Sequence, residues 1–164
     1  MEVTHQQLGY EIYNSCKSKP EKLLAAYNQG EKQLKNYKVY RREDIDDQEV
    51  ITAFMWAIFD LLNMNPKYER TTHFIFGVYV SDQEFSKNEA DQAMRRLEQK
   101  FNEYKNLFRK DGKTDYNYLS VAMKMAEYIT GDMANFIFAT ALAIDLQEFS
   151  LMWGKILKDT TIID

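Results

Sequence analysis

The residue types that carry most enzyme chemistry are scarce in this chain of 164 residues. It contains two histidines and one cysteine, and neither His5 nor His73 has a second histidine or a cysteine at the spacing of a zinc site. Its six glycines are scattered, and no glycine-rich phosphate-binding motif is present. We therefore expect no cofactor and no zinc site, and catalysis is not our leading interpretation.

One carboxylate is not explained by helix capping. Asp60 lies near the C-terminal end of the apolar segment 50–62, where the helix dipole disfavours a negative charge. A buried carboxylate must be paired or protonated, and such groups cluster at functional sites. We interpret Asp60 as the structural partner of an arginine or of a tyrosine hydroxyl. The alternative is a carboxylate-dependent metal enzyme centred on Asp60, because helical bundles build metal centres from inward-facing acidic side chains.

A basic segment with interspersed tyrosines precedes the apolar one. Between residues 17 and 42 the only acidic residues are Glu21 and Glu31, and the rest of the charged residues are lysine or arginine. A mixture of cations and tyrosines can contact phosphates and stack on bases. A solvated basic face is the simpler interpretation, and the segment is also our candidate surface for a protein or a nucleic acid. The candidate residues are Lys17, Lys19, Lys22, Lys32, Lys35, Tyr37, Lys38, Tyr40, Arg41 and Arg42.

A stripe of apolar residues indicates a long amphipathic helix that ends at about residue 110. Ser81 with Glu84 and Ser86 with Glu89 are successive capping-box patterns, and either can begin this helix. The stripe can pack inside the monomer, or it can pair with a partner or a second copy, so we leave monomer and homodimer open. After Ala90, the residues of this candidate helix-pairing stripe are Met94, Leu97, Phe101, Tyr104 and Phe108.

The element that must organise the fold is the segment 50–62, VITAFMWAIFDLL. Its apolar residues run round the whole helix rather than along one face, which is typical of a helix buried on most sides. Carboxylates at Asp46, Asp47 and Glu49 lie where they can cap the first turn and complement the helix dipole. We therefore predict a central helix that the other helices cover.

Helical patterns cover most of the remaining chain. Ser18 and Glu21 form a capping-box pattern for a second helix, and Gly30 either ends that helix or lies inside a longer one. Gly131 is the expected stop of another helix, and Asp145 is the expected N-cap of the last one. The predicted helices cover 4–17, a segment from about 19 onward, 50–62, a segment that begins after Ser81 or Ser86 and ends at about 110, 115–130, 133–144 and a segment after 145.

The segment 72–80 is ambiguous between helix and strand. Its β-branched and aromatic residues favour a strand, but the periodicity of so short an apolar run does not distinguish a strand from a buried helix. A strand over 73–80 would need a partner, and 37–41 is the available one, so we favour a helix. We predict a mainly α, compact bundle of about six or seven helices, with this two-stranded pairing left open. It forms a single domain over 1–164, and 159–164 is a frayed tail.

Composition is that of a soluble globular protein, with 45% apolar residues and a net charge of −4. The apolar runs fall short of the ~20 residues that cross a bilayer, and no signal peptide is evident. A single cysteine, Cys16, agrees with a reducing compartment. We therefore expect a cytoplasmic protein that does not bind membranes. The bias toward Lys, Asn, Ile, Phe, Tyr and Met indicates AT-rich codons, as in a low-GC bacterium or a mobile element such as a phage.

The leading functional hypothesis is a non-enzymatic intracellular interaction protein, a small regulator or inhibitor that acts by contact with a protein partner. It rests on the missing catalytic motifs and on the abundance of tyrosine and methionine, which are common at interfaces. The alternative is nucleic-acid binding through the basic segment 17–42. The third hypothesis is the metal enzyme around Asp60.

Overall fold

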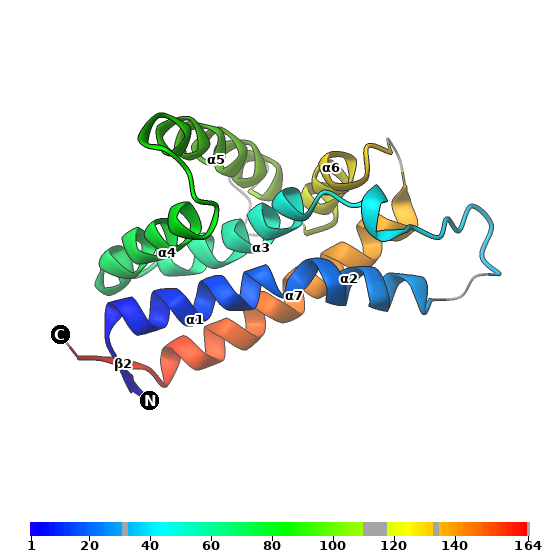
Figure 1. The fold of residues 1–164 in the computed structure, drawn as a ribbon. Coiled ribbons are helices and arrows are strands. Elements are labelled where there is room, and N and C mark those ends of the chain that lie inside the picture. The colour runs from blue at the N-terminus through cyan, green and yellow to red at the C-terminus, as the bar shows by residue number, and fades with distance from the viewer. Residues whose placement is uncertain (31–32, 110–117, 133–134, 164) are drawn as a thin grey trace.

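The computed structural model describes residues 1–30, 33–109, 118–132 and 135–163. Within these residues the chain forms seven α-helices, two short 3-10 helices at Arg42–Asp44 and Pro66–Tyr68, and one pair of two-residue strands (Figure 1). The prediction of a mainly helical bundle is confirmed. The α-helices are α1 (His5–Lys17), α2 (Lys19–Asn28), α3 (Asp47–Leu62), α4 (Glu69–Asp82), α5 (Lys87–Phe108), α6 (Tyr118–Thr130) and α7 (Phe136–Lys158).

Helix α3 lies at the centre of the bundle, as its sequence predicts. Every residue from Val50 to Phe59 is buried, and α3 contacts each of the other six described α-helices (Figure 1). The Asp46 carboxylate accepts hydrogen bonds from the backbone N–H groups of Gln48 and Glu49, at 2.9 and 3.2 Å. These bonds satisfy donors that a first turn otherwise leaves free. Local sequence therefore determines both the start and the burial of this helix.

The capping-box predictions have different outcomes. Of the two patterns proposed for the start of α5, Ser86 with Glu89 forms the box, whereas Ser81 lies in the last turn of α4. The box at Ser18 is wrong, because α2 follows α1 directly, Ser18 has helical backbone angles and its side chain makes no capping hydrogen bond. Helix α2 ends at Asn28, so Gly30 lies beyond it rather than inside a longer helix.

Residues 69–82 form helix α4, so the pairing of 37–41 with 73–80 as two strands is wrong. The extended chain around Tyr40 has no need of a strand partner. The N–H of Tyr40 donates to Oδ1 of Asn28 at 3.2 Å, and its carbonyl accepts from Nδ2 of Asn28 at 2.8 Å. One amide side chain thus satisfies the hydrogen bonds of both backbone groups of Tyr40. In a β-sheet, a neighbouring strand would satisfy them instead.

The β pair that the described residues do form joins the beginning of the chain to its end. Strand β1 (Glu2–Val3) runs parallel to β2 (Thr161–Ile162), and the N–H of Thr161 donates to the carbonyl of Met1 at 2.8 Å (Figure 1). The expectation that this tail is frayed is therefore wrong for residues 159–163. A strand of two residues forms only when another strand pairs with it. The local sequence does not show which distant segment supplies that partner.

Helix α7 runs without a break from Phe136 to Lys158, so the predicted N-cap at Asp145 is wrong. Asp145 lies inside the helix and accepts a hydrogen bond from Nζ of Lys19 at 2.7 Å. The same ammonium lies 4.7 Å from the ring centroid of Phe149, a favourable cation–π distance. An ion pair with α2 explains this carboxylate instead of a cap.

Helix α7 is the one helix among the described residues that is long and apolar enough, by length and composition, to cross a membrane. In its most apolar 18-residue window, 44% of the residues are buried inside the molecule. Core helices of folded proteins meet the same criterion, and α7 packs against α3 and α6. We describe α7 as a core helix with one exposed face.

Gly9 lies where α1 and α4 approach each other closely. A Cβ at Gly9 would be 2.8 Å from Cβ of Phe74 and 3.3 Å from the backbone nitrogen of Ile75. We expect Gly9→Ala to lower the free energy of unfolding by about 1–3 kcal/mol through overpacking. Gly77→Ala is the matched control in α4, where an added Cβ meets no atom within 4 Å, and it should raise stability by about 0.5–1 kcal/mol. Urea denaturation measures both, and stabilisation by both would contradict the close approach.

Candidate functional site

The candidate basic surface of segment 17–42 is largely neutralised by carboxylates, half of them from distant parts of the chain and half from residues 43–47. Lys22 and Lys35 are exposed and form no ion pair with a described residue, and Lys32 lies outside the described residues. Few unpaired cations therefore remain to contact phosphates. The ion pairs are Lys17–Asp82 at 2.5 Å, Lys19–Asp145 at 2.7 Å, Lys38–Asp132 at 2.7 Å, Arg41–Glu43 at 3.3 Å, Arg41–Asp44 at 3.7 Å and Arg42–Asp47.

The tyrosines of this segment are used for packing. Tyr27 and Tyr40 are buried, and the ring of Tyr37 stacks on that of Tyr27 with centroids 5.1 Å apart. Tyr40 packs edge to face on Phe138, with centroids 5.3 Å apart. A base stacks only on an exposed ring face, so two of these rings are closed to nucleic acid and the third already has a stacking partner.

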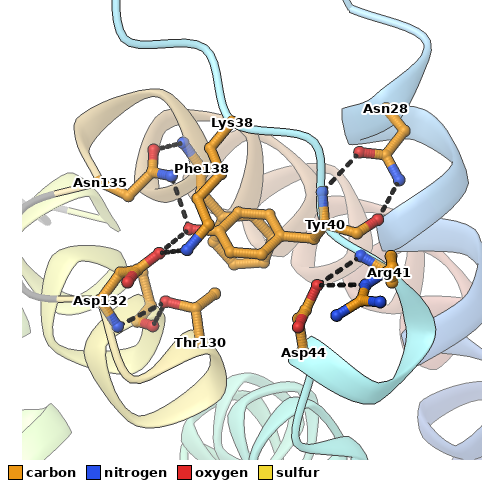
Figure 2. Close-up of polar contacts among 10 residues, drawn as sticks. Asn28, Lys38, Tyr40, Arg41, Asp44, Thr130, Asp132, Asn135 and Phe138 are labelled. Atoms are coloured by element: carbon orange, nitrogen blue, oxygen red, sulfur yellow. Dashed lines mark hydrogen bonds and ion pairs between the residues drawn. The ribbon is translucent and has the colours of Figure 1, made fainter.

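The Tyr40 hydroxyl anchors the segment to the junction of α6 and α7 (Figure 2). It donates to Oδ2 of Asp132 at 2.7 Å and accepts from Nδ2 of Asn135 at 2.6 Å. Burial, with the Asp132 carboxylate, raises the pKa of Tyr40 to about 12. Lys38 and Tyr40 together lower the pKa of Asp132. A neutral tyrosine held between a carboxylate and an amide is a structural tether rather than an acid or a base for chemistry near neutral pH.

Two ion pairs make the fold sensitive to acid. Hydrogen bonds from Lys17 and Tyr13 lower the pKa of Asp82, as those of Lys38 and Tyr40 do for Asp132. Both pairings stabilise the fold at pH above the unfolded value of about 3.9, and the stabilisation is lost as pH falls through the lower, folded pKa. We expect the free energy of unfolding to decline below about pH 4.

The double variant Asp82→Asn with Asp132→Asn should show a shallower acid decline than the unaltered protein. Urea denaturation at a series of pH values between neutral and about pH 2 measures the slope that these carboxylates contribute. The same slope in both proteins would contradict the lowered pKa values.

The candidate helix-pairing stripe on α5 packs inside the molecule. Leu97, Tyr104 and Phe108 are buried, and Met94 and Phe101 are partly buried against the core. The ring of Phe108 meets Trp56 of α3 edge to face, with centroids 5.1 Å apart. Most of the stripe is therefore covered by the chain's own core.

Asp60 has an arginine partner, as its position predicts. Nη2 of Arg109 donates to Oδ1 of Asp60 at 2.7 Å, and the Asp60 side chain is only 15% exposed. Pairing offsets the cost of removing the carboxylate from water. Within the described residues, no group of three or more His, Cys, Asp or Glu could hold a metal ion. The hypothesis of a metal enzyme around Asp60 therefore gains no support from them.

Three adjoining hollows meet at the C-terminal end of α3. The first, about 740 Å³, lies between α3 and α7 and reaches the nearest ends of α5 and α6. It shares Asp60 and Met64 with a second hollow of about 400 Å³, and it shares Leu61, Gly154 and Lys158 with a third of about 220 Å³. The second and third have no described lining residue in common, so the hollows form a row with the first in the middle. We call this row the α3-end groove.

The middle of the α3-end groove is apolar and open to solvent. Met64 and Leu151 line it and are 58% and 59% exposed, although both are large apolar side chains. Leu61 and the buried ring of Phe108 lie beside them. Contiguous exposed apolar surface in a folded protein marks binding sites for proteins or ligands. The α3-end groove is our candidate functional site.

Cations line all three hollows of the groove. Lys105 and Arg109 line the second hollow, Lys155 and Lys158 line the first, and Lys67 and Lys158 line the third. Among the described lining residues of all three hollows, Asp60 is the one carboxylate, and Arg109 already neutralises it. The buried Nε of Arg109 has no hydrogen-bond acceptor among the described residues. The groove therefore combines exposed apolar side chains with lysines that form no ion pair with a described residue.

Sequence reasoning found Asp60 but missed the α7 side of this groove. Leu151, Gly154, Lys155 and Lys158 follow the i, i+3, i+4, i+7 spacing of one helical face. The available signal was an apolar residue, Leu151, that falls outside the buried stripe of α7. The predicted break at Asp145 hid this signal because it divided one long helix into two.

In comparisons with protein-family models, with curated proteins and with solved structures, the chain matched none of them.

Proposed function

We propose that the protein is a non-enzymatic interaction protein, a small regulator or inhibitor that binds a partner protein in the α3-end groove. The observation that carries this proposal is the open apolar middle of the groove, where Met64 and Leu151 are more than half exposed. Leaving two such side chains in water forgoes hydrophobic free energy that burial in an interface would recover.

The polar groups in the groove suit recognition. Gln147, Lys155 and Lys158 are exposed polar residues that line the middle hollow together with its apolar residues. An apolar centre with a polar rim is the usual composition of a protein interface, and methionine is enriched in such interfaces. These features support a docking surface.

The alternative of nucleic-acid binding through segment 17–42 draws less support. Lys17, Lys19 and Lys38 are held in ion pairs at 2.5 to 2.7 Å, and a phosphate would have to displace their carboxylates. Retention on DNA or RNA that falls steeply between low and moderate salt would favour this alternative.

The test of the proposed function is partner capture from cells of the native host. Immobilised protein is compared with Leu151→Glu, which places a charge in the apolar middle of the groove. We expect a specific protein to be captured by the unaltered chain and its capture to fall more than tenfold with Leu151→Glu, since an unpaired charge is costly to bury in an interface.

Tyr10→Glu is the matched control, because Tyr10 is 57% exposed on the surface of α1. It should retain the partner, and circular dichroism should show that both variants keep their helices. Capture that survives Leu151→Glu, capture lost equally with Tyr10→Glu, or no specific partner for the unaltered chain would each refute the proposed function.

A further inference from the structure

We infer that the α3-end groove binds an acidic amphipathic α-helix of the partner protein. This inference rests on the proposed function and names the chemistry of the occupant. It is carried by three features of the groove, which are its unpaired cations, the exposed apolar side chains that lie between and beside them, and the open helix surface around Gly154.

The groove gathers cations that are left unpaired, in a protein whose net charge is −4. Lys67, Lys105, Lys155 and Lys158 line the three hollows and form no ion pair with a described residue. The lysines of segment 17–42 that have acidic neighbours are paired with them at 2.5 to 2.7 Å. Unpaired cations in an acidic protein are complementary to carboxylates of a partner, which would steer the encounter and set its specificity.

The order of these features selects an amphipathic ligand. Lys105 lies at one end of the row of hollows and Lys67 at the other, while Lys155 and Lys158 line the middle beside the apolar side chains of Met64 and Leu151. A nucleic acid would supply phosphates to these lysines, but it carries no aliphatic side chains to cover Met64 and Leu151. A helix with leucine-like residues on one face and carboxylates beside them meets both parts of the groove.

The shape of the α7 side fits a helix. From Gln147 to Lys158 this side extends over about 16 Å, or about three helical turns at 1.5 Å per residue. Gly154 lies within this stretch, and a Cβ added there would meet no atom within 4 Å. Glycine is a poor helix former, yet at this position it leaves the backbone of α7 open to close approach by another helix.

The test uses two labelled synthetic peptides of about fifteen residues and the full chain. Both peptides carry leucine at i, i+3, i+7 and i+10 among alanines, and one carries glutamate where the other carries lysine. Fluorescence anisotropy at low and moderate salt should show the glutamate peptide binding at least tenfold more tightly than the lysine peptide. A single-stranded oligonucleotide of similar length should bind more weakly than the glutamate peptide.

Three variants locate the binding. The double variant Lys155→Glu with Lys158→Glu should weaken binding of the glutamate peptide at least tenfold, and Gly154→Leu should do the same by filling the groove. Lys22→Glu with Lys35→Glu, which makes the same charge change at two exposed lysines outside the groove, should leave binding unchanged. Circular dichroism verifies that each variant is folded.

Equal binding of the two peptides, tighter binding of the oligonucleotide, or equal loss with Lys22→Glu and Lys35→Glu would overturn the inference. So would self-association through the groove, seen by light scattering as a dimer that Leu151→Glu dissociates. If a cellular partner is lost with Leu151→Glu while the glutamate peptide fails to bind, the acidic helix is refuted and the proposed docking groove stands. If no cellular partner depends on Leu151, the proposed function itself fails.

Discussion

Replacing Tyr40 by alanine is expected to lower the free energy of unfolding by about 3–5 kcal/mol, the usual cost of deleting a buried aromatic ring. Tyr40 is 2% exposed and packs against Phe138 and Tyr27. Its loss would also leave Asp132 and Asn135 without the hydroxyl that joins them (Figure 2). A tyrosine that served to stack on bases would instead be exposed, and its removal would affect binding with little effect on stability.

Urea denaturation of three variants separates these contributions. Tyr40→Phe keeps the ring and should cost about 1–3 kcal/mol, because it leaves buried polar partners unsatisfied. Tyr10→Ala removes an exposed tyrosine and should change stability by no more than about 0.5 kcal/mol. A Tyr40→Ala protein as stable as Tyr10→Ala would show that Tyr40 does not anchor the fold.

Gln147→Pro is expected to destabilise the protein by about 3 kcal/mol or more. Gln147 is exposed in the middle of α7, so the substitution removes little packing. Proline there would delete an interior helical hydrogen bond and clash with the preceding turn. If a new helix began at Asp145, residue 147 would lie in its first turn, where proline is well tolerated.

Gln147→Ala is the control, because it removes the same side chain while keeping the backbone N–H. It should be neutral or slightly stabilising, since alanine is the best helix former. Thermal or urea denaturation of the two variants therefore tests the continuity of α7. A Gln147→Pro protein that unfolds at the same urea concentration as Gln147→Ala would show that α7 is broken near Asp145.

Predictions from the sequence succeeded where the interacting groups are close in the chain or where a pattern is extreme. The cap at Asp46 and the box of Ser86 with Glu89 involve residues two to three positions apart. The burial of α3 follows from apolar residues on all of its sides. Asp60 shows a third kind of success, since a carboxylate at the wrong end of a helix dipole was expected to have an arginine or a tyrosine hydroxyl as its partner. The sequence did not identify Arg109 as that partner.

Predictions failed where the decisive contact joins distant residues. Asp145 looks like a cap in sequence, and only its pairing with Lys19 of α2 explains it inside α7. The basic segment 17–42 appears free for binding until the fold brings Asp82 and Asp132 to Lys17 and Lys38. In each case local propensity gave a reasonable alternative that long-range electrostatics and packing overrode.

The amino-acid sequence is thus sufficient to establish a helical bundle organised around residues 50–62, because hydrophobic periodicity and capping act over a few residues. It also shows that histidine and cysteine, two residue types often used in catalysis, are scarce in this chain. Which charges remain available for a partner depends on the folded molecule, because ion pairing is decided by distances between side chains from different helices. The α3-end groove has the same origin, since its apolar middle and its terminal lysines come from separate elements that only packing brings together.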